Sequence, residues 1–131
     1  SALYDTFGWK TKLAAINTTV EEMINSGLKY GYASYWNSYN YVIQSDFQIQ
    51  ISAVEITDDG VSPYYWLCSK DWYDYSTYNG QTFLLLSPDE KVEFDHSKYK
   101  ESVNSTIVNE FQLKNSDYYV YIFSGNLKLK S

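Results

Sequence analysis

The sequence predicts an α/β fold: one small domain with a mixed, mostly parallel sheet, helices on at least one face and a C-terminal antiparallel hairpin. Its 131 residues fit a single domain. In the first half of the chain, segments with apolar residues at helical spacing alternate with strand-like segments, which is typical of parallel βαβ units. Near the C-terminus, strand-like segments follow one another across short turns, which favours antiparallel pairing.

The first predicted helix ends near Ser26-Gly27. Before this point, apolar residues occur at spacings that place them on one helix face: Leu13, Ile16, Val20, Met23 and Ile24. Gly27 is able to take the left-handed backbone conformation that terminates helices. A short strand, Leu28–Ala33, is predicted to follow.

A second helix is predicted over residues 34–44, with a serine as its N-cap. The next strand begins near Phe47, where apolar and polar residues alternate. The alternation slips after Ala53, because Val54 and Ile56 are both apolar. We therefore expect a β-bulge near Ala53.

The second half begins with turn residues, Thr57–Pro63, and a ring-rich irregular segment, Tyr64–Tyr78. The elements predicted after it are a strand, a short helix and three more strands: Thr82–Leu86, Ser97–Val103, Ile107–Leu113, Tyr118–Phe123 and Leu127–Lys130. The first of these strands is unbroken apolar after its Thr, the pattern of a central strand covered on both faces. The closing strands are separated by turn residues, as in a hairpin.

The charge and the cysteine content exclude several classes of function. All ten basic residues are Lys, and 16 acidic residues bring the formal net charge to −6. No nucleic-acid partner is expected, because phosphate neutralisation needs clustered cations, and bidentate Arg clamps are excluded. The single Cys68 and the single His96 exclude an internal disulfide and a Cys/His zinc site. Neither a metal nor a cofactor is predicted, and no dinucleotide-binding glycine motif occurs.

Aromatic residues, at 19% of the chain, are the main compositional outlier. Tyr32, Tyr35 and Trp36 lie where a predicted strand meets a predicted helix, and ligands of α/β sheets prefer the carboxyl ends of strands. We interpret the aromatic rings of these three residues as a candidate surface on which a sugar or a lipid-linked sugar would stack. The alternative is core packing, which is common for rings at helical spacing.

The densest group of rings lies in Tyr64–Tyr78 and supplies three more candidate ligand-binding residues, Trp66, Trp72 and Tyr73. Irregular segments run over the surface. Exposed rings there would bind a sugar, a partner or a membrane interface. The alternative is a loop that packs its own rings against the sheet.

No catalytic residue is predicted. Acidic pairs occur at Asp58-Asp59, at Asp71 with Asp74, and at Asp89-Glu90. Nothing in the sequence brings two of these pairs to the separation that a glycosidase needs. His96 lies in a polar stretch, and we expect it to be a solvated surface residue.

Three stretches carry a resemblance to a known family: Gly27–Ser38 (GLKYGYASYWNS), Pro63–Tyr73 (PYYWLCSKDWY) and Gln81–Leu86 (QTFLLL). In this order they resemble the soluble C-terminal domain of bacterial polytopic membrane glycosyltransferase-like proteins. That family is of the protein-mannosyltransferase and aminoarabinose-transferase type, which uses lipid-linked sugars. The resemblance covers roughly residues 13–87. Tyr65 departs from the family pattern, in which a basic residue precedes Trp-Leu.

The resemblance implies a domain on the extracytoplasmic face of the bacterial cell membrane, carried by a membrane-embedded part of the same protein. The chain starts at Ser1-Ala2 without Met, so we expect an excised piece in which residues 1–12 are a linker from that part. The family's catalytic carboxylate lies in a loop of the membrane part, so the resemblance places none in this chain. The implied function is a non-catalytic accessory domain that positions an acceptor or a lipid-linked sugar for a parent glycosyltransferase.

Two other functions stay open. A free carbohydrate-binding module would explain the aromatic excess, although most such modules are all-β sandwiches and a helix ending at Gly27 argues against that class. A small stand-alone hydrolase would need a convergent acid/base set drawn from the acidic pairs and His96.

Overall fold

The computed structural model describes residues 18–34, 49–57, 60–63 and 80–127 of the chain. These residues form a six-stranded mixed sheet and three α-helices. Residues 18–25 are the first helix. The other elements are β1 (Tyr30–Ser34), β2 (Gln50–Thr57), β3 (Gly60–Pro63), β4 (Thr82–Leu86), α3 (Pro88–Asp95), α4 (Lys98–Val103), the 3-10 helix η3 (Asn104–Thr106), β5 (Ile107–Gln112) and β6 (Tyr119–Phe123).

The sheet has the strand order β3-β2-β1-β4-β6-β5. Parallel pairing is confined to β1, which pairs with β2 on one side and β4 on the other. The pairs β2–β3, β4–β6 and β5–β6 are antiparallel. The α/β class and the C-terminal hairpin, formed by β5 and β6, are therefore confirmed, but the prediction of a mostly parallel sheet is wrong. Part of Thr57–Pro63, predicted as turn material, forms β3 and pairs with β2 as a local hairpin.

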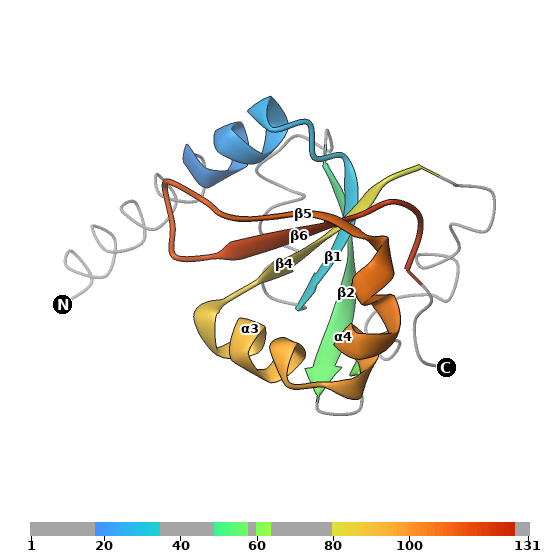
Figure 1. Cartoon of the computed structure of the whole chain (residues 1–131). Helices are drawn as coiled ribbons and strands as arrows, with labels where there is room; N and C mark the ends of the chain where they lie inside the picture. Colours follow the sequence, from blue (N-terminus) through green and yellow to red (C-terminus); the bar gives the residue numbers. More distant parts are fainter. Residues whose placement is uncertain (1–17, 35–48, 58–59, 64–79, 128–131) are drawn as a thin grey trace, which may run out of the picture.

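Helices cover both faces of the sheet (Figure 1). The helix over residues 18–25 packs on one face through Val20 and Met23. On the other face, α3 and α4 pack through Phe94 and the partly buried Tyr99. The apolar run of β4 serves both cores, because successive side chains point to opposite faces of a strand. All five β4 residues are buried, as predicted for a central strand.

The predicted bulge near Ala53 is not present. β2 pairs with β1 in unbroken register from Gln50 to Val54. The apolar residues change phase because both faces of β2 are covered: Ile51 belongs to the first core, and Val54 belongs to the second. The irregularity in the described sheet lies in β5 instead, between Ile107 and Asn109.

The helix α3 is not among the predicted elements, and its N-cap is Ser87. The Ser87 hydroxyl accepts a hydrogen bond from the Glu90 N–H at 3.3 Å, and the Glu90 carboxylate accepts one from the Ser87 N–H at 2.9 Å. These reciprocal bonds form a capping box, and Pro88 occupies the first turn, where its missing N–H costs nothing. The short helix predicted over Ser97–Val103 is confirmed as α4, with Ser97 as its N-cap.

The predicted ends of the remaining elements agree only in part with those in the structure. The first helix ends at Ser26-Gly27 as predicted, and Gly27 has a φ of 81°. The strand after it begins at Tyr30 rather than Leu28. Leu127 lies outside a strand, and the rest of the predicted Leu127–Lys130 strand lies beyond the described residues. The helix predicted over residues 34–44 also lies almost wholly outside them.

Candidate functional site

Of the six candidate ligand-binding residues, only Tyr32 falls within the described residues. It lies in β1 and is 1% exposed, and its hydroxyl donates a hydrogen bond to Asn126 Oδ1 at 2.5 Å. Its ring belongs to the core under α3 and α4. Tyr35, Trp36, Trp66, Trp72 and Tyr73 lie outside the described residues, so their role stays a prediction.

The carboxyl ends of the parallel strands lie at Ser34 for β1 and Leu86 for β4. The chain order reverses at β1, since β2 lies on one side of it and β4 on the other. Such a switch point is the usual ligand-binding edge of an open α/β sheet. Among the described residues at this edge, Ser87 and Glu90 are engaged in the capping box of α3.

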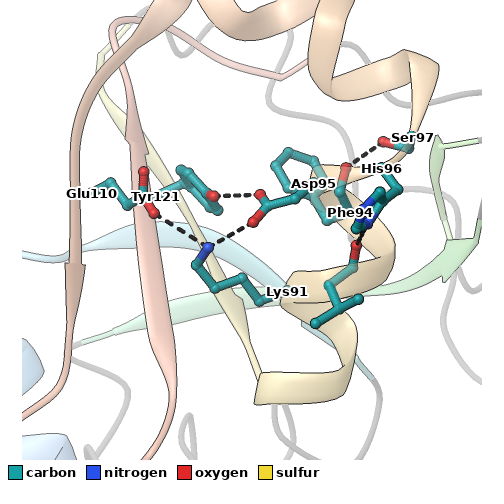
Figure 2. Close-up of polar contacts among 8 residues, drawn as sticks. Lys91, Phe94, Asp95, His96, Ser97, Glu110 and Tyr121 are labelled. Atoms are coloured by element: carbon teal, nitrogen blue, oxygen red, sulfur yellow. Dashed lines mark hydrogen bonds and ion pairs between the residues drawn. The ribbon is translucent and has the colours of Figure 1, made fainter.

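A polar cluster joins α3 to β5 and β6 (Figure 2). Lys91 Nζ lies 2.6 Å from Asp95 Oδ2 and 3.4 Å from Glu110 Oε1. The Tyr121 hydroxyl donates a short hydrogen bond to the other carboxylate oxygen of Asp95. The ammonium group of Lys91 also lies over the ring of Tyr119, 5.1 Å from its centroid. The cluster therefore anchors α3 to β5 and β6.

The cluster shifts the pKa of each group at its centre. Burial alone would raise the pKa of Asp95, but hydrogen bonds from Lys91 and Tyr121 outweigh burial and hold this pKa below its ordinary value. The hydrogen bond to Asp95 raises the pKa of Lys91, although burial opposes it. Burial and the bond to Asp95 raise the pKa of Tyr121. Near neutral pH the cluster thus holds an ionised Asp95, a charged Lys91 and a neutral phenol.

We expect this cluster to make stability depend on pH at both ends of the range. The contribution of Asp95 is present above its unfolded pKa of 3.8 and is lost as pH falls below that value. The contributions of Tyr121 and Lys91 are present below their unfolded pKa values of 10.0 and 10.5 and are lost as pH rises beyond them. Unfolding free energies measured by denaturant titration between about pH 2 and 6 should fall less steeply for Asp95→Asn than for the unsubstituted chain. Equal slopes would contradict the described Asp95 contacts.

The predicted acid and base candidates that lie within the described residues do not converge. Asp89 and His96 stand at opposite ends of α3, about 10 Å apart along its axis. His96 Nδ1 contacts the Val92 carbonyl oxygen at 2.8 Å on the exposed side of the helix. Glu90 is engaged in the capping box. Asp58, Asp71 and Asp74 lie outside the described residues.

In the described part of the chain, two cavities lie at the opposite edge of the sheet, near the amino ends of β1 and β4. One has a volume of about 340 Å³ and is lined by residues from Ser26 to Tyr30 and from Gln81 to Phe83, together with Ile122. The other, which we call the α4 cavity, has a volume of about 350 Å³. Its lining residues come from α4, η3 and the segment 123–127: Tyr99, Ser102, Val103, Thr106, Phe123, Ser124, Gly125, Asn126 and Leu127.

Sequence reasoning did not identify the α4 cavity. The sequence predicts Tyr99 only as part of the short helix Ser97–Val103, and residues 124–126 only as the turn between two strands. The α4 cavity is connected to one predicted site residue, Tyr32, whose hydroxyl donates a hydrogen bond to the side chain of Asn126. No local pattern indicates that link, because 94 residues separate the two positions.

In the part of the chain that the structure describes, no group of three or more His, Cys, Asp or Glu side chains is placed to hold a metal ion. No helix there is both long and apolar enough to cross a membrane.

Comparison of the chain with known proteins finds no matching family model, no matching curated protein and no matching solved structure.

Proposed function

We propose that this chain is a non-catalytic, extracytoplasmic accessory domain of a bacterial membrane glycosyltransferase-like protein. In this role it positions an acceptor or a lipid-linked sugar for the membrane-embedded part of the same protein. The observation that carries the proposal is the succession of three family-like stretches, Gly27–Ser38, Pro63–Tyr73 and Gln81–Leu86.

The described fold supports treating two of these stretches as one unit. The first supplies β1 and the third supplies β4, and the two strands are parallel neighbours at the centre of the sheet. Gly31 packs so closely on Phe83 that a Cβ atom built on Gly31 would lie 2.6 Å from the phenyl ring. Gly31 lies in the first family-like stretch and Phe83 in the third, so the two stretches pack directly on each other.

The polar groups of the described residues support a non-catalytic role. Asp95 and Lys91 pair with each other, Glu90 caps α3, and His96 contacts a backbone oxygen. Neither of the two cavities described above is lined by a carboxylate or an imidazole. General acid–base catalysis needs such groups within hydrogen-bond reach of the bond that reacts.

The full-length coding sequence tests this proposal. We expect a region of several membrane spans upstream of residue 1, with an acidic residue in an extracytoplasmic loop. Replacing that acidic residue should abolish sugar transfer by the full-length protein, whereas Asp89→Asn and Glu90→Gln should leave transfer measurable. A gene without membrane spans upstream, or transfer abolished by either substitution in α3 without loss of folding, would contradict the proposal.

A further inference from the structure

We propose that the backbone edge of β5 that faces away from β6, which we call the β5 edge, is a latent pairing surface for a second copy of this chain, and that Asn109 and a bulge at Val108 prevent the pairing. β5 is the last strand in the sheet order, and the described residues pair it with β6 alone. Four of its six residues have exposed side chains. The backbone groups of such an edge are a template for another strand.

Alternate residues of β5 direct their backbone N–H and C=O groups toward the β5 edge. The Leu113 N–H donates to the Tyr118 carbonyl at 2.9 Å, so Leu113 bonds to the neighbouring strand segment. Successive residues of an antiparallel strand alternate between pairs that exchange hydrogen bonds and pairs that do not. Counting back from Leu113, both Gln112 and Glu110 fall in pairs that exchange no hydrogen bonds with β6. Their backbone groups therefore point outward.

The segment Glu110–Gln112 is complementary to itself. Two copies can pair antiparallel with Phe111 of one copy opposite Phe111 of the other. The outward groups of Glu110 in each copy then meet those of Gln112 in the second copy, and each such pair exchanges hydrogen bonds in both directions. The arrangement has twofold symmetry, which is the commonest symmetry of protein homodimers.

The side chains of this segment also suit pairing with a second copy. Phe111 is half-buried on the side of the sheet that carries helix 18–25, and two rings directly opposite each other form a favourable cross-strand pair. Glu110 meets Gln112 in this register, so like charges are not directly opposite each other. The Glu110 carboxylate is turned toward Lys91, 3.4 Å from its Nζ (Figure 2).

Asn109 occupies one of the outward donors from within the chain. Its side-chain Oδ1 accepts a hydrogen bond from the Glu110 N–H at 2.9 Å. Just beyond β5, the Lys114 N–H donates to both carboxylate oxygens of Glu22, at 2.7 and 2.8 Å. A second strand gains little at a donor that already has an acceptor, because it only exchanges one hydrogen bond for another. These two side chains therefore weaken pairing along the β5 edge.

The bulge at Val108 interrupts the β5 edge on its other side. The register of β5 on β6 passes from Ile107 to Asn109, so Val108 is the extra residue. The Thr106 carbonyl accepts a hydrogen bond from the segment after β6, so the backbone groups of Ile107, the next residue, face outward. The outward groups of Ile107 and Glu110 are thus three positions apart. A regular strand repeats every two residues and cannot bond to both.

The opposite edge of the described sheet does not compete for a second copy. β3 is four residues long and ends at Pro63, and proline has no N–H to donate. Short strands and prolines are common features of edges that do not accept another strand. We therefore expect self-association through the sheet to occur at β5 once Asn109 and the bulge are removed.

Sedimentation equilibrium of the 131-residue chain tests the inference. We expect the unsubstituted chain to be monomeric up to about 200 µM. Asn109→Val removes the acceptor of the Glu110 N–H and should tighten self-association at least about tenfold, so that dimers appear in this range. Deleting Val108 as well restores a regular strand and should tighten it further. Asn104→Val makes the same exchange at an exposed position outside β5 and should leave the chain monomeric.

Gln112→Pro shows whether a dimer uses the β5 edge. Because the Gln112 N–H points away from β6, proline at this position removes an outward donor and leaves the hydrogen bonds between β5 and β6 in place. Proline is tolerated at such positions of edge strands. When it is combined with Asn109→Val and the Val108 deletion, we expect a return to the monomer.

Three results would overturn the inference. The first is an unsubstituted chain that already dimerises and becomes monomeric with Gln112→Pro. The second is a set of folded Asn109 and Val108 variants that stay monomeric, and the third is a dimer that Gln112→Pro does not dissociate. Thermal unfolding shows which variants are folded. If the deletion prevents folding, Asn109→Val alone decides, and a monomeric Asn109→Val chain contradicts the role of Asn109.

Discussion

Gly31→Ala is expected to destabilise the chain by about 3 kcal/mol, because overpacking a buried contact at the centre of the sheet forces strain on its neighbours. The added methyl carbon would lie 2.6 Å from three atoms of the Phe83 ring. Phe83 is 1% exposed and belongs to the core on the helix 18–25 side of the sheet, so its ring has little room to retreat. Chemical denaturation of both proteins gives the difference directly.

A matched substitution separates this clash from the general effect of replacing glycine. Gly125→Ala adds the same methyl group where no atom lies within 4 Å, and we expect it to change stability by less than about 1 kcal/mol. Phe83→Leu should recover part of the loss when it is combined with Gly31→Ala, giving a non-additive pair. Equal stability of Gly31→Ala and Gly125→Ala would show that Gly31 does not pack on Phe83 as described.

Phe94→Ala is expected to destabilise the chain by about 3–5 kcal/mol. Among the residues of α3, all of which are described, Phe94 alone is buried, at 0% exposure. Its ring lies 5.2 Å from that of Tyr121 and contacts the edge of Tyr99. Truncating Phe94 leaves a cavity in the core between α3 and β6. The helix then stays attached to the sheet mainly through the Lys91–Asp95–Tyr121 cluster.

Val92→Ala is the control for this prediction. Val92 lies in the same helix and is 58% exposed. Because Ala also favours helix more than Val does, we expect Val92→Ala to leave stability unchanged or slightly raised. Denaturant midpoints for the two variants that lie within experimental error of each other would contradict the role of Phe94 as the anchor of α3.

The strength of the local pattern decided which elements were predictable. The apolar run of β4 and the end of the first helix at Gly27 were predicted correctly, because each rests on residues close together in the chain. The helix α3 was missed because a single buried residue gives no helical periodicity, although Ser87 and Glu90 carried the capping-box signal. The bulge predicted near Ala53 was wrong because a strand with two covered faces also breaks the alternation of polar and apolar residues.

The α4 cavity depends on contacts between distant parts of the sequence. Thr82 and Gly125 are 43 positions apart, yet they meet because β4 and β6 pair antiparallel with Thr82 opposite Phe123. The pairing of β5 with β6, which sets Ile107 opposite Phe123, brings the segment 123–127 beside α4 and η3. A prediction from sequence would need the strand order β1-β4-β6 first, and local periodicity does not contain that order.

Thiol labelling in intact cells is the most direct test of the extracytoplasmic location. The full-length protein would carry Val92→Cys, at an exposed site, in a Cys68→Ser background and would be treated with a membrane-impermeant maleimide. We predict that labelling at position 92 in intact cells equals that in permeabilised cells, with no labelling at this domain in the Cys68→Ser parent. Labelling that requires permeabilisation would place the domain in the cytoplasm and contradict the proposed function.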